Sequence, residues 1–569
     1  MKIPQNELKK NLIKMSDKNF AISDKIIVII VFSIILLLGF LMRYKPYGYA
    51  IQHDYPMTVH SADANSRVSE AEGAVVTEQP YLLPAWFDDE KTDIVSPMPP
   101  ITRVLSALIT SLSGIGIYDS LYFIAVLATI GVAISFMLIF WKLFGNLWAG
   151  IISAILLVHP FEAFGNYLII LGMYPHVVQL TMTSITLMFF IKFLQNKTWK
   201  SLLESCLFFA FAFYTHSSLP ILIFGLMSLI MIYILVKKQI GWKKFIFFFI
   251  ISIILISPFL PILYSNWFAH GSAISVESAI HPDKIFTNLQ SGHTVQLFNF
   301  ITPILFFFMI LGLIFIFFVF KNKKYIIFSI ILFYLIFVVI LASYLGFNNG
   351  QINDKPRYML SLIAYPIAAL GVSGMVLLVK NQLKINYKII FILIFIIILI
   401  VQIVNFTKIP SVNQSLFSKD SYDNYLWVRN NIDDQKRILC IGCIQFEGMF
   451  THKPTYLPSY EVNDGVINQM LDIAQNNNTK GLILTEIMGH SDWRLHWVGL
   501  KLETYGFRYH LRLNRSICEF DYWIFKDLGQ VTPLINAIAL KIVAKNNTVV
   551  HAANNFFVIK NNYVKGECI

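Results

Sequence analysis

The sequence predicts a polytopic α-helical membrane protein with a C-terminal soluble α/β domain. Of its 569 residues, 56% are hydrophobic and only 14% are charged, and the mean hydropathy is +0.62. Soluble domains carry about 25% charged and 45–50% apolar residues, so a soluble enzyme of this length would lack a sufficient polar surface. The same composition excludes a disordered chain, and five cysteines are too few for a small disulfide scaffold.

Apolar runs along the chain predict about eleven membrane spans. A helix needs about 20 apolar residues to cross about 30 Å of hydrocarbon, and backbone groups in lipid must be paired within the protein. The expected spans, of which Leu202–Tyr214 is short, are Ile26–Met42, Leu121–Phe140, Leu147–Phe164, His176–Phe193, Leu202–Tyr214, Leu219–Val236, Phe245–Leu263, Phe300–Phe320, Tyr325–Leu345, Tyr358–Val379 and Ile389–Val404.

Lysine residues near the span ends predict the orientation. Positive charge marks the cytoplasmic side, and lysines precede the first span, so we expect a cytoplasmic N-terminus. The apolar run that follows reads as an anchor rather than a cleaved signal peptide. Alternating crossings then put the short basic connections on the same inner side, at Lys142, Lys197–Lys200, Lys237–Lys244, Lys321–Lys324 and Lys380–Lys388.

The chain is expected to form two domains. Residues 1–404 would form the transmembrane domain, with a large first outer loop at 43–119, and residues 405–569 an extracytoplasmic α/β domain. The second part carries seventeen basic and fifteen acidic side chains, so most of the net charge of +12 belongs to the membrane half. That distribution argues against nucleic acid as a partner. The expected elements of the second part are a helix end at Val428–Asn431, a helix at Gly465–Gln475, and strands at Arg437–Ile444 and Lys480–Thr485.

The first outer loop holds the main candidates for chemistry. A loop of this length is usually functional or disordered, and its Pro-bounded apolar run Pro99–Ile117 indicates an ordered, membrane-skimming structure. Asp54 and Asp63 lie in it on either side of Tyr55-Pro56, close to His53 and His60. Clustered carboxylates and histidines serve as a general base or as ligands of a hard metal ion. The alternative is a solvated acidic loop.

Further candidates belong to the same outer face. Glu162 follows His159-Pro160 at a span end, where an acid is either functional or simply faces water. His176 and His216 are expected at outer turns, where a histidine is more often a satisfied interfacial residue than a ligand. Arg357 ends the last outer loop and suits a phosphate, or it is an interfacial anchor. Cys440 and Cys443 read as structural: residues three apart on a strand point to opposite faces, so a disulfide within the pair is not expected, and one pair with His452 is too little for zinc.

These features resemble the GT-C superfamily of integral-membrane glycosyltransferases, which use polyprenyl-phosphate-linked sugars. The residues around Asp63, with Glu70-Ala71-Glu72-Gly73 after them, are similar to the family's acidic motif and the helix that follows it. Pro99-Pro100-Ile101-Thr102-Arg103 resembles the Pro-rich entry to a skimming helix, and Arg357-Tyr358 the late Arg-Tyr motif. Tyr425–Asn431 resembles the helix that opens the outer domain. The Trp-Trp-Asp motif of oligosaccharyltransferases is absent, which argues against transfer of a whole oligosaccharide to asparagine.

The resemblance implies a mechanism and its partners. The donor would be a polyprenyl-phosphate sugar, and the acceptor an envelope glycan, lipid or protein at the outer face of the bilayer. Asp63, with Asp54 as the second choice, would deprotonate or orient the acceptor hydroxyl for inverting attack on the anomeric carbon. Arg357, helped by His216, would hold the leaving phosphate. A divalent cation, Mg²⁺ or Mn²⁺, could bind Asp54, Asp63 and Glu162.

Two other classes stay open on the sequence. A transporter would place ionisable residues and broken helices near the bilayer midplane, often in two related halves. In this chain the polar residues gather at the outer boundary instead, and related halves are not evident. The other alternative is a non-catalytic envelope protein whose outer domain binds a partner.

Overall fold

The computed structural model describes most of the membrane helices and part of the C-terminal domain. The described residues are 22–59, 62–78, 82–83, 94–95, 99–143, 145–158, 172–216, 218–260, 303–316, 330, 333–334, 337, 363–376, 378–379, 387–407, 417–441, 448–453, 455–456, 520–526, 547–553 and 556–562. The chain divides into two compact units. The first takes residues 1–51, 122–259 and 274–412, and the second takes 52–121, 260–273 and 413–569.

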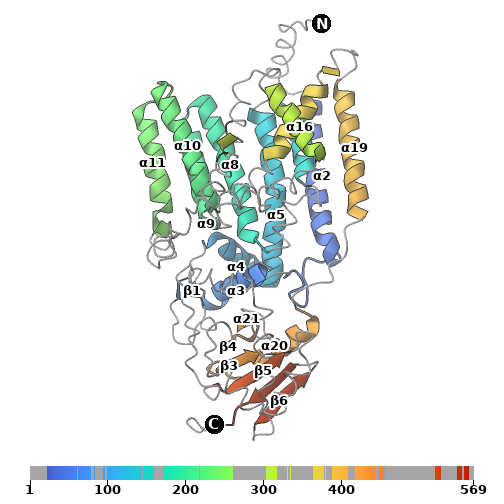
Figure 1. Cartoon of the computed structure of the whole chain (residues 1–569), viewed down its shortest axis with the longest axis vertical. Helices are drawn as coiled ribbons and strands as arrows, with labels where there is room; N and C mark the ends of the chain where they lie inside the picture. Colours follow the sequence, from blue (N-terminus) through green and yellow to red (C-terminus); the bar gives the residue numbers. More distant parts are fainter. Residues whose placement is uncertain are drawn as a thin grey trace, which may run out of the picture. The chain divides into compact units, whose positions relative to one another are not determined.

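The first unit is helical in its described part (Figure 1). Five of its helical segments are long and apolar enough to cross a membrane: Ile26–Tyr47, Ile117–Lys142, Tyr174–Asn196, Leu219–Val236 and Trp242–Phe259. The chain is therefore a polytopic membrane protein. The helices are α2 (Ile22–Tyr44), α5 (Ile117–Leu138), α6 (Leu147–Leu157), α8 (Tyr174–Asn196), α9 (Trp199–Thr215), α10 (Ser218–Val236), α11 (Trp242–Ile256), α16 (Pro303–Ile314), α19 (Tyr387–Thr407) and a helix at Ile363–Val376.

Every expected span except Tyr325–Leu345 overlaps one of these helices, and that one lies largely outside the described residues. The helix over the short run Leu202–Tyr214 extends to Trp199–Thr215. It packs along α8, and both helices also contact α10. Hydropathy therefore located the helices of the first unit where the structure describes them.

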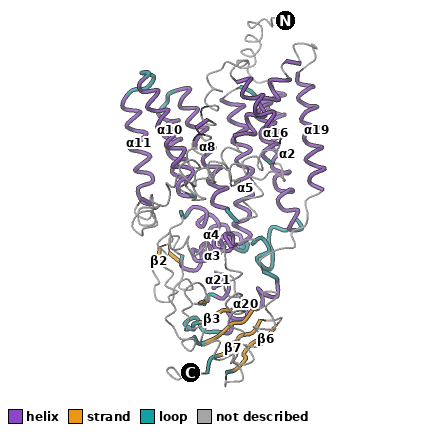
Figure 2. Tube along the Cα trace, viewed as in Figure 1, coloured by secondary structure: helices purple, strands orange, loops and turns teal. Residues whose placement is uncertain are grey.

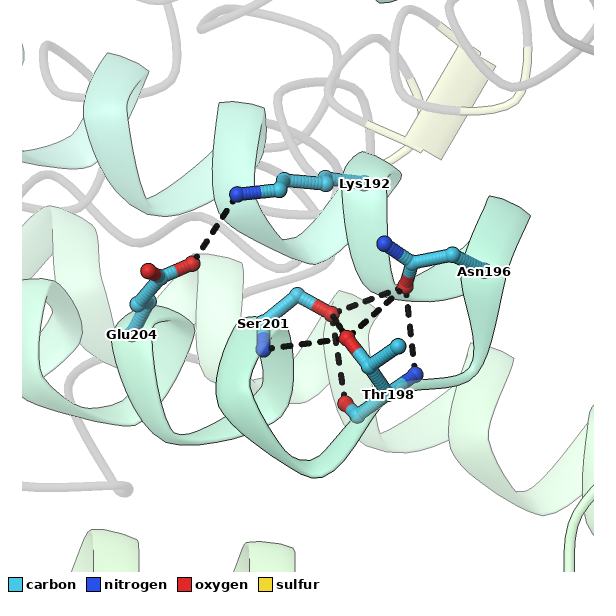
Figure 3. A network of polar contacts seen from close by, with 5 residues as sticks. All are labelled: Lys192, Asn196, Thr198, Ser201 and Glu204. Atoms are coloured by element: carbon cyan, nitrogen blue, oxygen red, sulfur yellow. Dashed lines mark hydrogen bonds and ion pairs between the residues drawn. The ribbon is translucent and has the colours of Figure 1, made fainter.

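The α8–α9 turn shows how a polar connection ends one span and begins the next (Figure 3). Lys197 has a left-handed backbone (φ 55°), which reverses the chain after α8. Thr198 is the N-cap of α9, and its hydroxyl accepts from the amide of Ser201 at 3.4 Å. The Asn196 side-chain oxygen accepts from the Thr198 amide at 3.1 Å and from the Ser201 hydroxyl at 2.9 Å. The turn is thus closed by its own side chains.

The second unit contains helices from the segment 52–121 and from the C-terminal part, and a mixed five-stranded sheet. Its helices are α3 (Ala62–Thr77), α4 (Ile101–Ser113), α20 (Lys419–Asn431) and α21 (Gly448–Thr451), together with the first turn of α5. The sheet has the order β4-β3-β5-β7-β6, with β3 parallel to β4 and β5, and β7 antiparallel to β5 and β6. Its strands are β3 (Ile438–Ile441), β4 (Thr455–Tyr456), β5 (Tyr522–Lys526), β6 (Thr548–Ala553) and β7 (Phe556–Lys560); β1 (Leu82–Leu83) and β2 (Ile94–Val95) form a separate pair.

The α/β character expected for the C-terminal part is present in its described residues. Figure 2 shows the strands of the five-stranded sheet as one group, and α20 contacts β7. The expected helix end at Val428–Asn431 is the end of α20, and β3 lies within the expected strand Arg437–Ile444. Tyr425 of α20 packs against Phe450 and Phe556 and joins helix to sheet. The expected elements at Gly465–Gln475 and Lys480–Thr485 lie outside the described residues.

Helix α4 has its amphipathic faces reversed relative to a soluble helix. Thr102, Arg103 and Ser106 are buried, whereas Leu108 is 52% and Leu112 is 79% exposed. A water-soluble helix buries its apolar stripe. A helix that presents leucines outward at a spacing of one turn suits the apolar boundary of a membrane. This arrangement agrees with the skimming helix expected from the Pro99–Ile117 run.

Candidate functional site

The loop that carries Asp54 is anchored to the first turn of α5. The His53 amide donates to Oδ2 of Asp119 at 2.7 Å, and His53 Nδ1 lies 2.8 Å from Oδ1 of the same carboxylate. The side chain of Asp119 is 1% exposed. An acidic side chain in the first turn of a helix is stabilised by the helix dipole. A hydrogen bond between these two atoms needs one proton, which is carried by the ring nitrogen or by the carboxyl group.

A second pair of hydrogen bonds joins the same two segments. The Tyr118 hydroxyl donates to the carbonyl of His53 at 2.7 Å. The Thr58 hydroxyl donates to the Tyr118 carbonyl at 3.3 Å. Residues 53 and 58 are therefore both tied to α5, and the backbone between them has little freedom to move.

Asp54 is the exposed member of this anchored loop. It follows His53 directly, so its backbone is fixed by the contacts of its neighbour. Asp54, Asp119 and Glu72 all lie close enough to the Tyr118 hydroxyl to interact with it electrostatically. An accessible carboxylate on a fixed backbone is suited to accept a proton from a bound hydroxyl.

Glu72 of α3 contacts the C-terminal part of the second unit. Its Oε1 lies 3.1 Å from Nε2 of His452 and 4.0 Å from Nη1 of Arg429. Tyr422 lies on the same helix as Arg429. Burial raises the pKa of Tyr422, and the negative charge of Glu72 raises it further. Glu72 thus has partners that come from α20 and from the turn after α21.

Asp63, the first choice on sequence, is the second residue of α3. One turn further along the helix, Arg67 Nη1 and Glu70 Oε1 form an ion pair at 2.9 Å. Both of these side chains are about nine-tenths buried. The acidic motif therefore contributes an ion pair to the packing of α3, and Asp54 is the candidate whose exposure and anchoring the structure describes.

Two candidate histidines meet in the first unit. His176 stands in the first turn of α8 and His216 directly follows α9; their ring centroids are 4.0 Å apart with an interplanar angle of 37°. Both are 7% exposed. The His216 carbonyl accepts a short hydrogen bond from the Gln179 side chain, and its amide donates to Ala212 at 3.2 Å. These two bonds hold the backbone of His216, whose ring lies close to that of His176.

Arg357 and Glu162 lie outside the described residues, so their expected roles stay predictions. Within the described ranges, His, Cys, Asp and Glu side chains do not gather in a group of three or more that could hold a metal ion. The expected cation ligands Asp54 and Asp63 lie on separate elements, the loop before α3 and α3 itself.

Sequence reasoning missed Asp119, Tyr118 and the partners of Glu72. Asp119 appeared only as the end of the outer loop, although its place at the start of an apolar run marks it as a first-turn acid. His53 lies 66 residues earlier, and His452 lies 380 residues after Glu72. Contacts over such separations leave no periodic signal in a single sequence.

Comparisons with known proteins find similar folds among solved structures. Neither a protein-family model nor a curated protein sequence matches the chain. Among solved structures, it is similar to ArnT from Cupriavidus metallidurans bound to undecaprenyl phosphate. The TM-score is 0.52 at 10% identity, over 94% of this chain and 98% of that one. It is also similar to the Archaeoglobus fulgidus oligosaccharyltransferase in complex with Zn and sulfate. There the TM-score is 0.51 at 13% identity, over 90% of this chain and 69% of that one.

Both of these proteins belong to the GT-C superfamily. The two similarities cover most of this chain, but the sequence identity is low. They are therefore evidence for the fold alone. The chain therefore has the fold of these two solved membrane proteins, which agrees with the fold expected from the sequence.

Proposed function

We propose that the protein is a membrane glycosyltransferase that moves a sugar from a polyprenyl-phosphate-linked donor to a hydroxyl-bearing acceptor. The fold supports the general class, and the ArnT structure that shares it holds undecaprenyl phosphate. The observation that carries the proposal is the anchored loop, in which His53 and Asp119 hold the backbone beside an exposed Asp54. A transferase needs such a fixed, accessible carboxylate on the acceptor side.

Asp54 is our first choice for the candidate base, ahead of Asp63. Its carboxylate would accept the proton of the acceptor hydroxyl as the hydroxyl oxygen attacks the anomeric carbon. The bond from that carbon to the phosphate oxygen would break on the opposite side, which inverts the configuration. The electron pair would leave with the polyprenyl phosphate. Because a phosphate is already a good leaving group, the base mainly sets the position and nucleophilicity of the acceptor.

The leaving phosphate needs hydrogen-bond donors near the outer ends of the spans. Arg357 is the expected cation, because its guanidinium can bind phosphate oxygens bidentately. His216 would add a donor, and its fixed position over His176 makes that donor pre-organised. Charge that develops on the phosphate oxygens in the transition state would then meet donors already in place.

A divalent cation remains part of the proposal at the acidic loop. Carboxylate oxygens are the ligands that Mg²⁺ and Mn²⁺ prefer. When bound, such an ion would supply a positive charge that draws electron density from a phosphate or hydroxyl oxygen. Asp54 is exposed and could bind such an ion, and Asp63 and Glu162 are the other candidate ligands. Removal of metal by EDTA, followed by addition of Mg²⁺ or Mn²⁺, tests this part separately.

For the topology we keep the sequence expectation. The N-terminus would be cytoplasmic, 1–404 would form the transmembrane domain, and 405–569 would face the extracytoplasmic side. Two observations support it: the α8–α9 and α10–α11 turns carry clusters of lysine, and Cys440 of β3 is disulfide-bonded. Disulfides persist in oxidising compartments outside the cytoplasm.

The central experiment compares Asp54→Asn and Asp63→Asn in the full-length protein. Purified enzyme in detergent would receive undecaprenyl-phosphate glucose or undecaprenyl-phosphate mannose, with membrane extract as the source of acceptor. Release of undecaprenyl phosphate and labelling of the acceptor are both measured. We expect Asp54→Asn to lower transfer at least about a hundredfold. The matched control is Asp420→Asn, which makes the same charge change at an exposed position in the first turn of α20.

The other outcomes are informative. If Asp63→Asn abolishes transfer and Asp54→Asn does not, the order of the two candidates is reversed. If both variants keep full activity, the acidic loop does not carry the chemistry. If neither donor is consumed but solute crosses proteoliposomes that contain the protein, the transporter alternative is favoured.

A further inference from the structure

Two turns at one end of the first unit carry lysine and no acid. The α8–α9 turn, 196–200, and the α10–α11 turn, 237–244, contain neither Asp nor Glu. Helices α9 and α11 begin in these turns, and neither has an acidic residue in its first turn. We define the lysine face by the residues Lys197, Lys200, Lys243 and Lys244; Lys237 and Lys238 border it.

Side-chain contacts bring the two turns together. Nζ of Lys244, in the α10–α11 turn, donates to the backbone carbonyl of Lys197, in the α8–α9 turn, at 2.6 Å. A lysine of one turn therefore supplies a hydrogen-bond donor to the backbone of the other. The same Nζ lies 5.6 Å from the ring centroid of Trp199. Trp199 in turn packs edge-on against Phe247 of α11 at 5.1 Å. The cations of both turns therefore share one surface.

The charges of this face oppose one another. Burial lowers the pKa of Lys197, and the nearby charge of Lys244 lowers it further. Lys200, Lys243 and Lys244 also stand in the first turns of α9 and α11, where the helix dipole is already positive. An anion at this surface would relieve both kinds of repulsion. Lys192, in contrast, has its own acidic partner, Glu204, at 3.2 Å (Figure 3).

Two tryptophans indicate the depth of this surface in the membrane. Trp199 is 46% and Trp242 is 66% exposed, each at the first residue of its helix. Exposed Trp at span ends concentrates at the level of the lipid headgroups. Lysines at that level reach headgroup phosphates with the ammonium while the stem stays on apolar surface. The anion most accessible to this surface is therefore a lipid phosphate.

We propose that the lysine face is a binding site for the phosphate of an anionic phospholipid headgroup, separate from any donor site. Lys197 and Lys244 would contact the phosphate directly, and Lys200 and Lys243 would add attraction from the helix starts. The site needs only the end of the helical bundle, and hence it does not depend on the glycosyltransferase proposal or on which side of the membrane this end faces.

The test titrates the purified full-length protein with phosphatidylglycerol and with phosphatidylcholine, and counts bound lipids by native mass spectrometry. We expect wild type to prefer phosphatidylglycerol and the double variant Lys197→Gln/Lys244→Gln to weaken that binding about tenfold or more. The matched control is Lys560→Gln, at an exposed position of β7 in the second unit. This variant should leave phosphatidylglycerol binding unchanged.

Three results would overturn the proposal. They are equal binding of the two lipids by wild type, unchanged phosphatidylglycerol binding in the double variant, and displacement of the lipid by millimolar inorganic phosphate. The last would indicate a site for free anions instead. If the double variant fails to fold, Lys200→Gln/Lys243→Gln keeps the Lys244–Lys197 contact. It should still weaken phosphatidylglycerol binding severalfold, and no change there would also refute the site.

Discussion

His53 makes two contacts with the buried carboxylate of Asp119. One oxygen of Asp119 accepts from the His53 amide at 2.7 Å, and the other lies 2.8 Å from Nδ1 of the ring. The pair fixes both the backbone and the side chain of His53. Since Asp54 is the next residue, the same pair decides where the candidate base can lie. His53 and Asp119 are therefore positioning residues in the proposed reaction.

The first prediction concerns Asp119→Asn. Asparagine keeps only one acceptor oxygen, so it cannot accept both from the His53 amide and from a protonated Nδ1. Leaving a buried donor unsatisfied costs about 1–3 kcal/mol, so we expect a lower free energy of unfolding. We also expect kcat to fall about tenfold or more with little change in the donor KM, because only the position of Asp54 changes. Thermal unfolding and steady-state transfer measure the two effects.

A purely structural role for Asp119 predicts something different. The variant would then lose stability while the folded fraction kept its full kcat. Asp119→Glu serves as the conservative rescue, because it restores an acceptor although its longer side chain shifts His53. Partial recovery of kcat in that variant supports positioning of Asp54; recovery of stability alone contradicts it.

The sequence predicted the helices of the membrane unit well because hydropathy is a local property. A run such as Leu219–Val236 must be a helix in lipid whatever its neighbours are. Helix α4 also starts directly after Pro100, as expected. The anchor of the loop could not be predicted, since the link from His53 to Asp119 depends on how the outer loop folds back on α5.

The second prediction concerns the paired histidines. His216→Phe keeps an aromatic ring over His176 but removes both ring nitrogens, so packing should be retained while a phosphate donor is lost. Hydrogen bonds to charged groups contribute about 1.5–3 kcal/mol. We therefore expect the Kd for undecaprenyl phosphate to rise about tenfold or more, with a Tm close to wild type. Binding is measured by native mass spectrometry or by calorimetry in detergent.

Gln179→Leu is the companion variant for the histidine pair. It removes the side-chain donor to the His216 carbonyl and leaves both imidazoles in place. If His216 binds the phosphate from a fixed position, this variant should weaken binding by a smaller factor than His216→Phe. Unchanged binding in both variants would exclude His216 from the phosphate site.

The third prediction is a dependence of stability on pH at His551. Its ring stacks on Trp427 with centroids 4.2 Å apart, and Nε2 lies 2.8 Å from Oδ1 of Asn424. Burial lowers the pKa of His551 below its usual value. The unfolded chain then binds a proton in a pH range where the folded chain does not. Stability from this residue is therefore present above about pH 6.5 and is lost as the pH falls through that value.

The measurement compares wild type with His551→Gln between pH 7.5 and 5.5. Glutamine can donate to the same Asn424 oxygen but does not titrate in this range. We expect the difference in Tm between the two proteins to shrink as the pH falls. A difference that stays constant across this range would show that His551 binds protons equally in the folded and the unfolded states, which contradicts a lowered pKa in the folded protein.

The fourth prediction concerns the close approach of α16 and the helix Ile363–Val376. A Cβ at Gly371 would overlap the carbonyl oxygen of Phe308 and lie 2.9 Å from the amide of Gly312. A Cβ at Gly312 would overlap the carbonyl oxygen of Ile367. Small residues at such crossings let membrane helices approach closely. Because the obstacles are backbone atoms, neither helix can relieve the overlap by a side-chain rotation.

Gly371→Ala should therefore separate the two helices and lower the free energy of unfolding by about 1–3 kcal/mol, as overpacking does in well-packed cores. Gly225→Ala in α10 is the matched control, because among the described residues its Cβ would meet the Tyr334 hydroxyl alone, at 3.1 Å. The end of a side chain can yield, and alanine favours the helix over glycine, so we expect little loss there. Thermal unfolding in one detergent compares the two variants, and an equal effect of both would refute backbone contact as the cause.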